Sequence, residues 1–167
     1  MNPDPQSLEW NSPEWRGQRD LKLKEWFRGN EPALQTALLL SGISEVWDDL
    51  VDGDVKATTE RINGAFVAAL VRLRTNSFYV HNEVTLFPTI IAGINAWMDA
   101  NELQGGTRED RAQAFYIRNY AYELVSIIVF CIGGWDYLRS VSLEMRRFFT
   151  HESYFTWEHR HAADKPV

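Results

Sequence analysis

Apolar residues recur with the period of an α-helix along most of this 167-residue chain. Over 43–50, for example, they stand at positions i, i+3, i+4 and i+7, which places them on one face of a helix. The alternating pattern of a half-buried strand is not sustained anywhere, and no Asn-Gly or Asp-Gly turn joins two β-branched runs. The sequence therefore predicts an all-α fold.

Helix start and stop signals divide the chain into six or seven segments of helix length. Ser12 before Pro13 predicts the first start, with the serine as N-cap and the proline in the first turn. That helix is expected to stop at Gly29-Asn30, and the next one to run to Asp52-Gly53. Ser41-Gly42 predicts a kink or a break within this second helix.

The same kind of signal continues through the middle of the chain. Apolar residues keep the helical period over 62–73, and the polar run 75–77 is expected to end that helix. A short helical piece is predicted over 78–86. Pro88 then predicts the start of a further helix, because proline is favoured in the first turn of a helix and disfavoured inside one.

The most apolar stretch, 124–132, belongs to a long helix that is predicted to start at the capping residue Thr107 and to end at Gly133-Gly134. A helix that is apolar on nearly every side is a buried one, so we expect it at the centre of a helical bundle. The stretch is far shorter than the ~20 residues that cross a membrane, and no membrane span is predicted. We expect 62–73, 91–98 and 124–132 to build the core.

The two ends of the chain are expected to differ from its middle. One helical domain is predicted over 13–149, with extended arms at both ends, an N-terminal arm over 1–12 and a C-terminal tail over 150–167. Both ends hold large aromatic rings, which are enriched in protein–protein interfaces. These rings are predicted to contact neighbouring subunits of a homo-oligomer; the alternative is that each end folds back on the chain's own core. The candidate interface residues are Trp10, Trp15, Tyr154, Phe155 and Trp157.

The formal net charge of −6 comes from one segment, 31–60, which holds seven acidic residues and one basic residue. The other segments are balanced and none is strongly basic, so nucleic-acid binding is disfavoured. The single cysteine, Cys131, cannot form an internal disulfide and lies among apolar residues. This predicts a buried, unreactive thiol and a reducing compartment.

Four acidic residues form a stripe on the helix predicted to end at Asp52. Counted from Glu45, the offsets 3, 4 and 7 put four carboxylates on one side of that helix. Three interpretations stay open: a solvated helix face, a docking face for a basic partner surface, and a site for a divalent cation, which carboxylate oxygens bind. The acidic stripe consists of Glu45, Asp48, Asp49 and Asp52, with Asp54 close by.

A metal site on the acidic stripe would suit a small metal-dependent phosphohydrolase, which is the enzymatic alternative. Asp99 and Glu102 are the candidate second carboxylate pair, and their spacing from the first is not diagnostic. The sequence has no phosphate-binding glycine loop, no nucleophile elbow and no zinc-binding motif. His81 falls in the short helical piece predicted over 78–86 and is expected to be a structural residue. We therefore predict a chain without catalytic residues, metal or other cofactor.

Four stretches, 45–54, 62–79, 94–103 and 120–134, together resemble a group of small all-helical proteins encoded by tailed bacteriophages, most of them without an assigned function. The resemblance covers 43–148 and consists of the order of helices and aromatic positions, without a catalytic motif. It implies a phage origin and an all-α core.

Together with the aromatic ends, this resemblance implies a non-enzymatic protein that acts through protein–protein contacts. The expected role is a virion component or an assembly factor. Its partners would be other phage structural proteins, and its location the virion, assembled in the host cytoplasm. A third alternative is an acidic phage factor that binds a basic protein of the host, with the acidic stripe steering the association.

Overall fold

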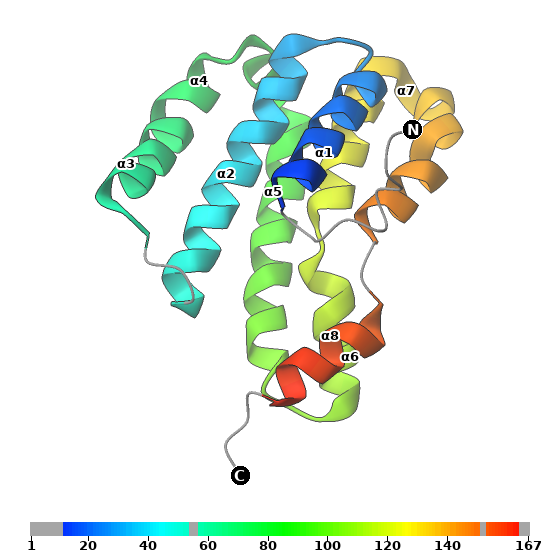
Figure 1. Ribbon diagram of the computed structural model, residues 1–167. Helices are drawn as coiled ribbons and strands as arrows, with labels where there is room; N and C mark the ends of the chain where they lie inside the picture. The colour runs from blue at the N-terminus through cyan, green and yellow to red at the C-terminus, as the bar shows by residue number, and fades with distance from the viewer. Residues whose placement is uncertain (1–11, 54–56, 151–152, 164–167) are drawn as a thin grey trace.

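The computed structural model describes residues 12–53, 57–150 and 153–163, the last five of them by their backbone alone. All regular structure in this part of the chain is helical, which confirms the all-α class. The division into six or seven helices is not confirmed, because several boundaries fall elsewhere. Figure 1 shows the helices packed side by side, with α8 at the lower end. The elements are α1 (Pro13–Trp26), α2 (Glu31–Asp52), α3 (Thr59–Val67), η2 (Ala68–Arg72), α4 (Leu73–Thr75), α5 (Ser77–Leu103), α6 (Arg108–Arg118), α7 (Ala121–Phe149) and α8 (Tyr154–Ala163).

The predicted start and end of the first helix are confirmed. The Ser12 side chain accepts a hydrogen bond from a backbone N–H in the first turn of α1 at 3.1 Å, and Pro13 opens the helix. The chain leaves α1 through Arg28 and Gly29, whose φ angles are 53° and 71°. Glycine adopts this left-handed backbone without steric cost. Asn30 then caps α2 by accepting from a backbone N–H at 3.0 Å.

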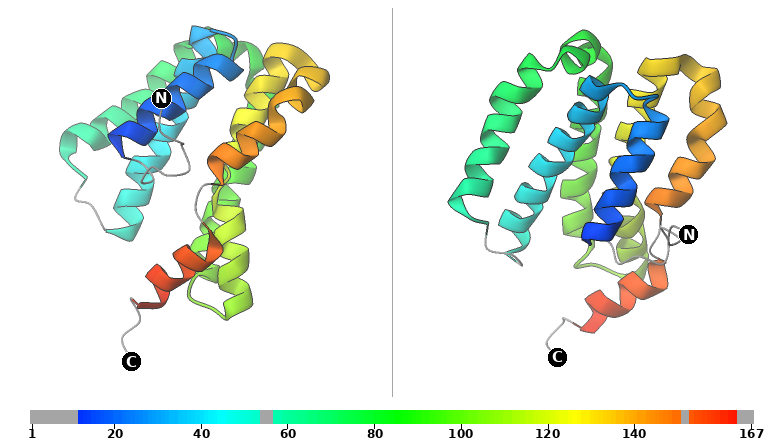
Figure 2. Two further views of the ribbon diagram at one scale, coloured as in Figure 1. Left: turned by 45° about the vertical axis from the view of Figure 1, so that its right-hand side comes forward. Right: turned by 45° about the horizontal axis from the view of Figure 1, so that its top comes forward.

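Helix α2 runs without a break from Glu31 to Asp52, so the kink predicted at Ser41-Gly42 is wrong. The Ser41 hydroxyl donates to the Glu45 carboxylate one turn along, at 3.2 Å, instead of competing with the helix backbone. α2 lies between α3 on one side and α1 and α5 on the other (Figures 1 and 2). Packing on several sides outweighs the cost of about 1 kcal/mol for one glycine inside a helix.

Helix α5 is continuous over 27 residues and contains Pro88, so the predicted start of a new helix at this proline is wrong. A proline inside a helix removes one backbone hydrogen bond and crowds the preceding turn, at a cost of about 3 kcal/mol. Tyr79 and Leu86 are buried before the proline and Ala100 after it, which holds both halves against the core. A buried side chain of leucine size contributes about 1.5–3 kcal/mol, so this packing offsets the cost of the proline.

The chain is interrupted at Asn119, so the single long helix predicted from Thr107 is wrong there. Asn119 has φ −85° and ψ 62°, and its side-chain amide donates to the backbone carbonyl of Phe149 at 2.7 Å. The ring of Tyr120 packs over Gly93 of α5, where an added Cβ would lie 2.7 Å from the ring. Both contacts join residues far apart in the sequence, so the helical period carries no signal for them.

The chain reverses within α7, at the glycine pair where a helix end is predicted. Gly134 has φ 73° and ψ −170°, a backbone that residues with a Cβ rarely adopt. The two halves of α7 lie side by side (Figures 1 and 2). The second half carries aromatic rings onto α1: the Trp26 ring centroid lies 5.5 Å from that of Phe148 and 6.1 Å from that of Phe149. The core therefore sits between α1, α2, α5 and both halves of α7.

The predicted core is wrong for two of its three stretches. In 62–73 only Ala68 and Leu73 are buried, and in 91–98 no residue is. The third stretch, 124–132, does reach the core through four buried residues. α3 and η2 lie on the outer side of α2, away from α7 (Figure 1), so within the described chain no helix covers their outer face.

Segment η2, between α3 and α4, is a turn of π-helix. The backbone N–H of Leu73 donates to the carbonyl of Ala68, five residues earlier, where an α-helix would use the carbonyl four residues earlier. This irregular turn lies within a stretch whose spacing predicts a regular helix.

The C-terminal segment is not extended over its described residues. Tyr154–Ala163 form α8, which lies against α6 at the lower end of the molecule (Figures 1 and 2). Of the predicted N-terminal arm, 1–12, all residues but Ser12 lie outside the described part of the chain.

Candidate interaction surface

The acidic stripe lies on the second half of α2, and two of its carboxylates have arginine partners within the chain. Glu45 lies 3.4 Å from the Arg16 guanidinium and 3.7 Å from that of Arg19, both on α1. Asp49 pairs with Arg61 of α3 at 2.6 Å. These pairs are partly exposed, and such pairs contribute about 0–1 kcal/mol each. Their effect is to place positive charge directly beside the stripe.

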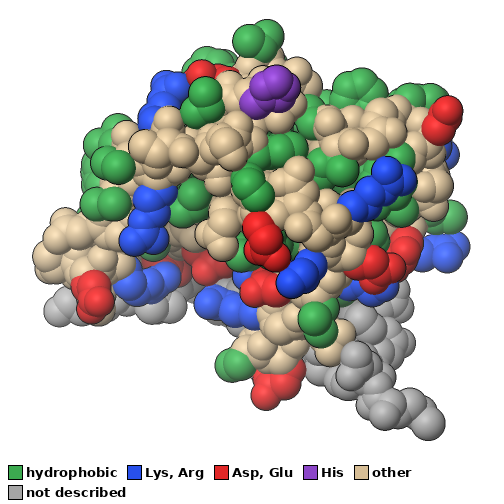
Figure 3. All heavy atoms as spheres, turned by 90° about the horizontal axis from the view of Figure 1, so that it is seen from above, with side chains coloured by type: hydrophobic (Ala, Val, Ile, Leu, Met, Phe, Trp, Pro, Cys, Tyr) green, Lys and Arg blue, Asp and Glu red, His purple; other side chains and the backbone are tan. Residues whose placement is uncertain are grey.

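The other residues of the acidic stripe do not converge with these two. Asp48 accepts a hydrogen bond from the indole Nε1 of Trp97 at 2.9 Å, next to a 4.9 Å contact between the ring centroids of Trp47 and Trp97. Asp52 is exposed at the end of α2, and Asp54 lies outside the described residues. Among the described residues, no three metal-ligating side chains come together. Seen from above, acidic and basic side chains alternate on the surface (Figure 3).

Of the two candidate interface residues at the N-terminal end, the structure describes only Trp15. Trp15 is 2% exposed, and its ring centroid lies 5.8 Å from that of Phe148, so it belongs to the core. Trp10 lies outside the described residues. A contact between subunits through Trp10 stays a prediction, and the described residue Trp15 does not offer an exposed ring for it.

The aromatic residues of α8 have different surroundings. Trp157 is 4% exposed and packs on Phe115 of α6, with 5.5 Å between the ring centroids. Tyr154 lies 5.7 Å from the same ring. Phe155 is 66% exposed, and among the described candidate interface residues its ring is the most accessible. Only Phe155 therefore has the exposure that an interface anchor on α8 needs.

An ion pair fastens α8 to α6. The Arg108 guanidinium donates to both carboxylate oxygens of Glu158, at 3.0 and 3.2 Å, and the Tyr154 hydroxyl donates to one of them at 2.9 Å. The hydrogen bond from Arg108 lowers the pKa of Glu158 and raises that of Arg108 itself. Desolvation and the hydrogen bond to Glu158 raise the pKa of the Tyr154 hydroxyl. At neutral pH the ion pair is therefore charged and the hydroxyl protonated.

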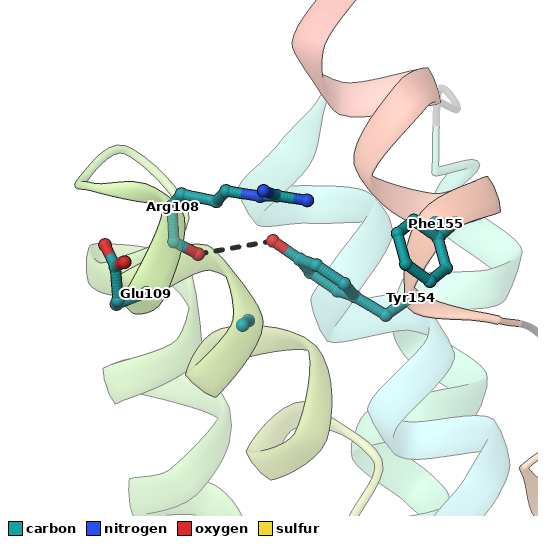
Figure 4. Close-up of a pocket in the computed structure, with 5 residues that line it drawn as sticks. Arg108, Glu109, Tyr154 and Phe155 are labelled. Atoms are coloured by element: carbon teal, nitrogen blue, oxygen red, sulfur yellow. Dashed lines mark hydrogen bonds between the residues drawn. The ribbon is translucent and has the colours of Figure 1, made fainter.

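A hollow of about 250 Å³ lies beside this ion pair (Figure 4). In the close-up, Tyr154 points toward the backbone carbonyl of Arg108, 3.2 Å from its hydroxyl, and Glu109 points away from both. The charged groups do not converge on one point, as a site for a small molecule would require. The lining residues are Arg108, Glu109, Ala112, Tyr154 and Phe155.

An apolar stripe that no described helix covers runs along α5. Six side chains on it are between 39% and 91% exposed. They are spaced four, three, four, three and four residues apart, which is the repeat of a coiled-coil seam. Because a helix turns once in 3.6 residues, this spacing keeps them on one side along its length. We call this set the outer stripe: Val80, Val84, Phe87, Ile91, Ile94 and Met98.

The outer stripe is not predicted from the sequence, although the sequence contains its spacing. The helix boundary predicted at Pro88 divides the stripe in two, and 91–98 is then assigned to the core. The four-three repeat can be recognised only when α5 is taken as one helix. Each half alone is too short to distinguish a coiled-coil seam from a helix face that packs in the core.

A second exposed apolar face lies on α3 and η2. Its side chains are between 45% and 70% exposed. The segment that carries it is joined to α5 by an ion pair between Arg74 of α4 and Glu83 of α5. Monomeric proteins rarely expose apolar patches larger than a few hundred Å², so both faces are candidate interaction surfaces. The residues are Phe66, Val67, Leu70 and Val71.

The single cysteine is less buried than predicted, although its pKa shift fits the predicted low reactivity. Cys131 is half-buried, and desolvation raises the pKa of its thiol. Because the thiolate is the nucleophile, a raised pKa makes the thiol less reactive at neutral pH. His81 is exposed in the second turn of α5, beside the outer stripe.

One stretch within Arg108–Glu158 is long and apolar enough to cross a membrane, judged by length and composition alone. Its most apolar window is 22% buried. The core helix of a soluble protein passes the same test, so this is weak evidence for a span. The expectation of no membrane span stays a prediction.

No protein-family model, curated protein or solved structure matches this chain. The surface of the molecule is therefore the basis for its proposed function.

Proposed function

We propose that this chain acts through protein–protein contacts, as a component or an assembly factor of a larger particle, and not as an enzyme. The observation that carries the proposal is the outer stripe of α5, a continuous row of exposed apolar side chains. Contact between such surface and water is unfavourable by about 25 cal/mol per Å², so a partner that covers it gains free energy. The exposed ring of Phe155 on α8 is a further candidate contact.

A bacteriophage setting is part of this proposal. It is supported by the resemblance of 43–148 to small helical proteins of tailed phages. In that setting the partners are other phage structural proteins and further copies of the chain. The location is the virion, assembled in the host cytoplasm.

The particle fraction provides the test of this proposal. We expect the full-length chain, tagged and expressed from the phage genome proposed to encode it, to co-sediment with particles through a density gradient. Ile91→Lys, on the outer stripe, should remove the chain from the particle fraction. Leu143→Lys is the matched control, because Leu143 is a similarly exposed apolar residue on α7, and it should leave co-sedimentation intact. The proposal would be overturned if the wild-type chain were found only outside the particle fraction.

The metal-dependent phosphohydrolase has less support. Glu45 and Asp49 pair with arginines on different helices, and Asp48 is held by the indole of Trp97. A divalent cation on the acidic stripe would have to displace these partners before it could gather the carboxylates.

Magnesium titration tests this alternative. We expect millimolar MgCl₂ to change the Tm no more than NaCl of equal ionic strength does. A bound cation would stabilise the folded chain by mass action. A magnesium-specific rise in Tm that disappears in Asp49→Asn would support the phosphohydrolase instead.

The acidic host-binding factor is also less supported. Arg16, Arg19 and Arg61 reduce the negative charge that the acidic stripe presents outward. Binding through exposed charge would weaken steeply with salt, whereas contacts through the outer stripe should be insensitive to it. The salt dependence of any partner complex therefore separates the two.

A further inference from the structure

We propose that the outer stripe of α5 pairs with the outer stripe of a second copy of this chain, as two antiparallel helices related by a twofold axis. The inference rests on the proposed function, because it names the surface and the first partner through which the chain would assemble. It is supported by the spacing of the stripe, by its exposed area, by the residues that flank it and by the charges at the two ends of α5.

The spacing of the outer stripe specifies a helix as its occupant. In a seam with a four-three repeat, each side chain fits between four residues of a facing helix with the same repeat. The stripe extends from Val80 to Met98, which is about 27 Å at 1.5 Å per residue. A second copy supplies a helix of the same length and the same repeat, so the surface is complementary to itself.

The exposed area is close to what a stable interface needs. Six apolar side chains at these exposures leave on the order of 600 Å² accessible. A standard interface takes about 800 Å² from each partner, and the residues beside the stripe supply the difference. The largest apolar patch of a monomeric protein is about 300–600 Å². The exposed area of the stripe is therefore at the upper end of the range for apolar patches that stay in contact with water.

The residues that flank the outer stripe do not repel the outer stripe of a second copy. In coiled coils, charges at the positions beside the seam choose the partner. Here those positions hold His81, Pro88 and Asn95 on one side and Ile90 and Trp97 on the other. None of them is an Asp, Glu, Lys or Arg. Glu83 is the acidic exception, and it is already paired with Arg74 of the same chain.

Charge at the two ends of α5 selects the antiparallel direction. Asp99 and Glu102 are exposed near its C-terminal end, and Arg72 is exposed just before its N-terminal end. Arg74 lies at the same end but is already paired with Glu83. If the stripes are centred on each other, Val84 of one copy faces Ile94 of the other, and the acidic end of each helix lies beside the basic end of its partner. Parallel pairing would place the two acidic ends together. Antiparallel helix dipoles also attract.

Disulfide trapping tests the partner and the direction together. In a Cys131→Ser background, a mixture of Val84→Cys chains and Ile94→Cys chains should form a covalent dimer under mild oxidation. Val84→Cys alone should not, because antiparallel pairing separates the two copies of this position by about 15 Å along the axis. A disulfide needs Cα atoms about 5.5–6 Å apart. Dimers from Val84→Cys alone would overturn the antiparallel arrangement.

Molar mass in solution tests the surface without cysteines. We expect light scattering to give a dimer for the full chain, and Ile91→Lys to raise the dissociation constant roughly 100-fold, because each dimer would bury two ammonium groups. Leu143→Lys should leave the constant unchanged. A mass that Ile91→Lys does not alter, whether monomer or oligomer, would overturn the proposal.

The outcomes separate this inference from the proposed function. A monomer that still co-sediments with particles, and loses this with Ile91→Lys, overturns the pairing and leaves the proposed function standing. A dimer with the expected cross-links that is absent from particles supports the pairing and overturns the particle role. Binding of a monomer to phosphatidylcholine–phosphatidylglycerol vesicles, lost with Ile91→Lys, overturns the pairing in favour of a lipid surface.

Discussion

The inner and outer sides of α5 have similar residues and opposite surroundings. On the inner side Tyr79, Leu86 and Ala100 are at most 5% exposed, whereas on the outer side Val80 and Ile91 are more than half exposed. Both sets follow one helix and both are apolar. The difference comes from the neighbours, because α2, α6 and α7 pack against α5 and the side chains of the outer stripe stay exposed among the described residues. Apolar spacing identifies the faces of a helix, but it does not say which face is in the core.

Truncating one residue on each side gives the largest expected contrast. Leu86→Ala leaves a cavity at a fully buried position, so it should lower the free energy of unfolding by about 2–5 kcal/mol. Ile91→Ala should change it by about 0.5 kcal/mol or less in the monomer. Urea unfolding at dilute protein concentration measures both. Equal losses would mean that the outer stripe is covered within the chain.

Two helical glycines, one in a crowded position and one in an open position, give a second comparison between packed and exposed sites. At Gly93, on the inner side of α5, an added Cβ would meet the ring of Tyr120 at 2.7 Å. Gly93→Ala should therefore destabilise the chain by about 1–3 kcal/mol. At Gly42 of α2 nothing lies within 4 Å, and Gly42→Ala should stabilise by about 0.5–1 kcal/mol through helix propensity. Thermal unfolding of the two variants should shift in opposite directions, and shifts of the same sign would contradict the packing at Tyr120.

The start of α5 provides a smaller contrast. Asn76 accepts hydrogen bonds from the backbone N–H groups of Phe78 and Tyr79 at 2.9 and 3.0 Å. Asn76→Ala should cost about 1–2 kcal/mol, as the loss of a helix cap does. Asn95 on the exposed side bonds only to the carboxylate of Asp99 at 2.8 Å, and Asn95→Ala should stay within about 0.5 kcal/mol. Urea unfolding ranks the two, and a reversed order would contradict the role of Asn76 as the cap.

The smallest expected effect concerns the contact of α8 with α6. The ion pair with Arg108 lowers the pKa of Glu158 in the folded chain. It therefore stabilises the docked helix above the unfolded pKa of about 4.3, and this contribution is lost as pH falls through the lowered folded value. Hydrogen exchange at the indole of Trp157, followed during acid titration, should report the release of α8. Glu158→Gln should remove this acid transition, whereas Glu109→Gln, on the neighbouring helix, should leave it unchanged.

Helix ends that depend on nearby residues can be predicted from the sequence. Ser12 caps α1 and Thr107 caps α6 as predicted, and Asp110 completes a capping box with Thr107. Gly134 reverses the chain. The errors occur where a contact from elsewhere in the fold decides the outcome. Pro88 stays inside a helix because both halves of α5 are anchored in the core.

The candidate site shows the same division between local and distant causes. The spacing of the acidic stripe correctly places its residues along one helix. It does not predict that arginines of α1 and α3 and the indole of Trp97 contact them. The four-three spacing of the outer stripe is present in the sequence. Its exposure depends on where α2 and α7 pack, which a pattern along one helix does not contain.

The π-helical turn η2 sets the rotational phase of the segment that follows it. In a regular α-helix, side chains five residues apart are separated by about 140° around the axis. The wider turn brings Ala68 and Leu73, both buried, toward the same side. A segment of the same length in a regular α-helix would place Leu73 about 140° from Ala68 and turn the leucine toward water. A chain shortened by one residue between them would place the two four residues apart, about 40° around the axis, and keep both on the same side. The π-helical turn thus accommodates one extra residue without moving the buried leucine.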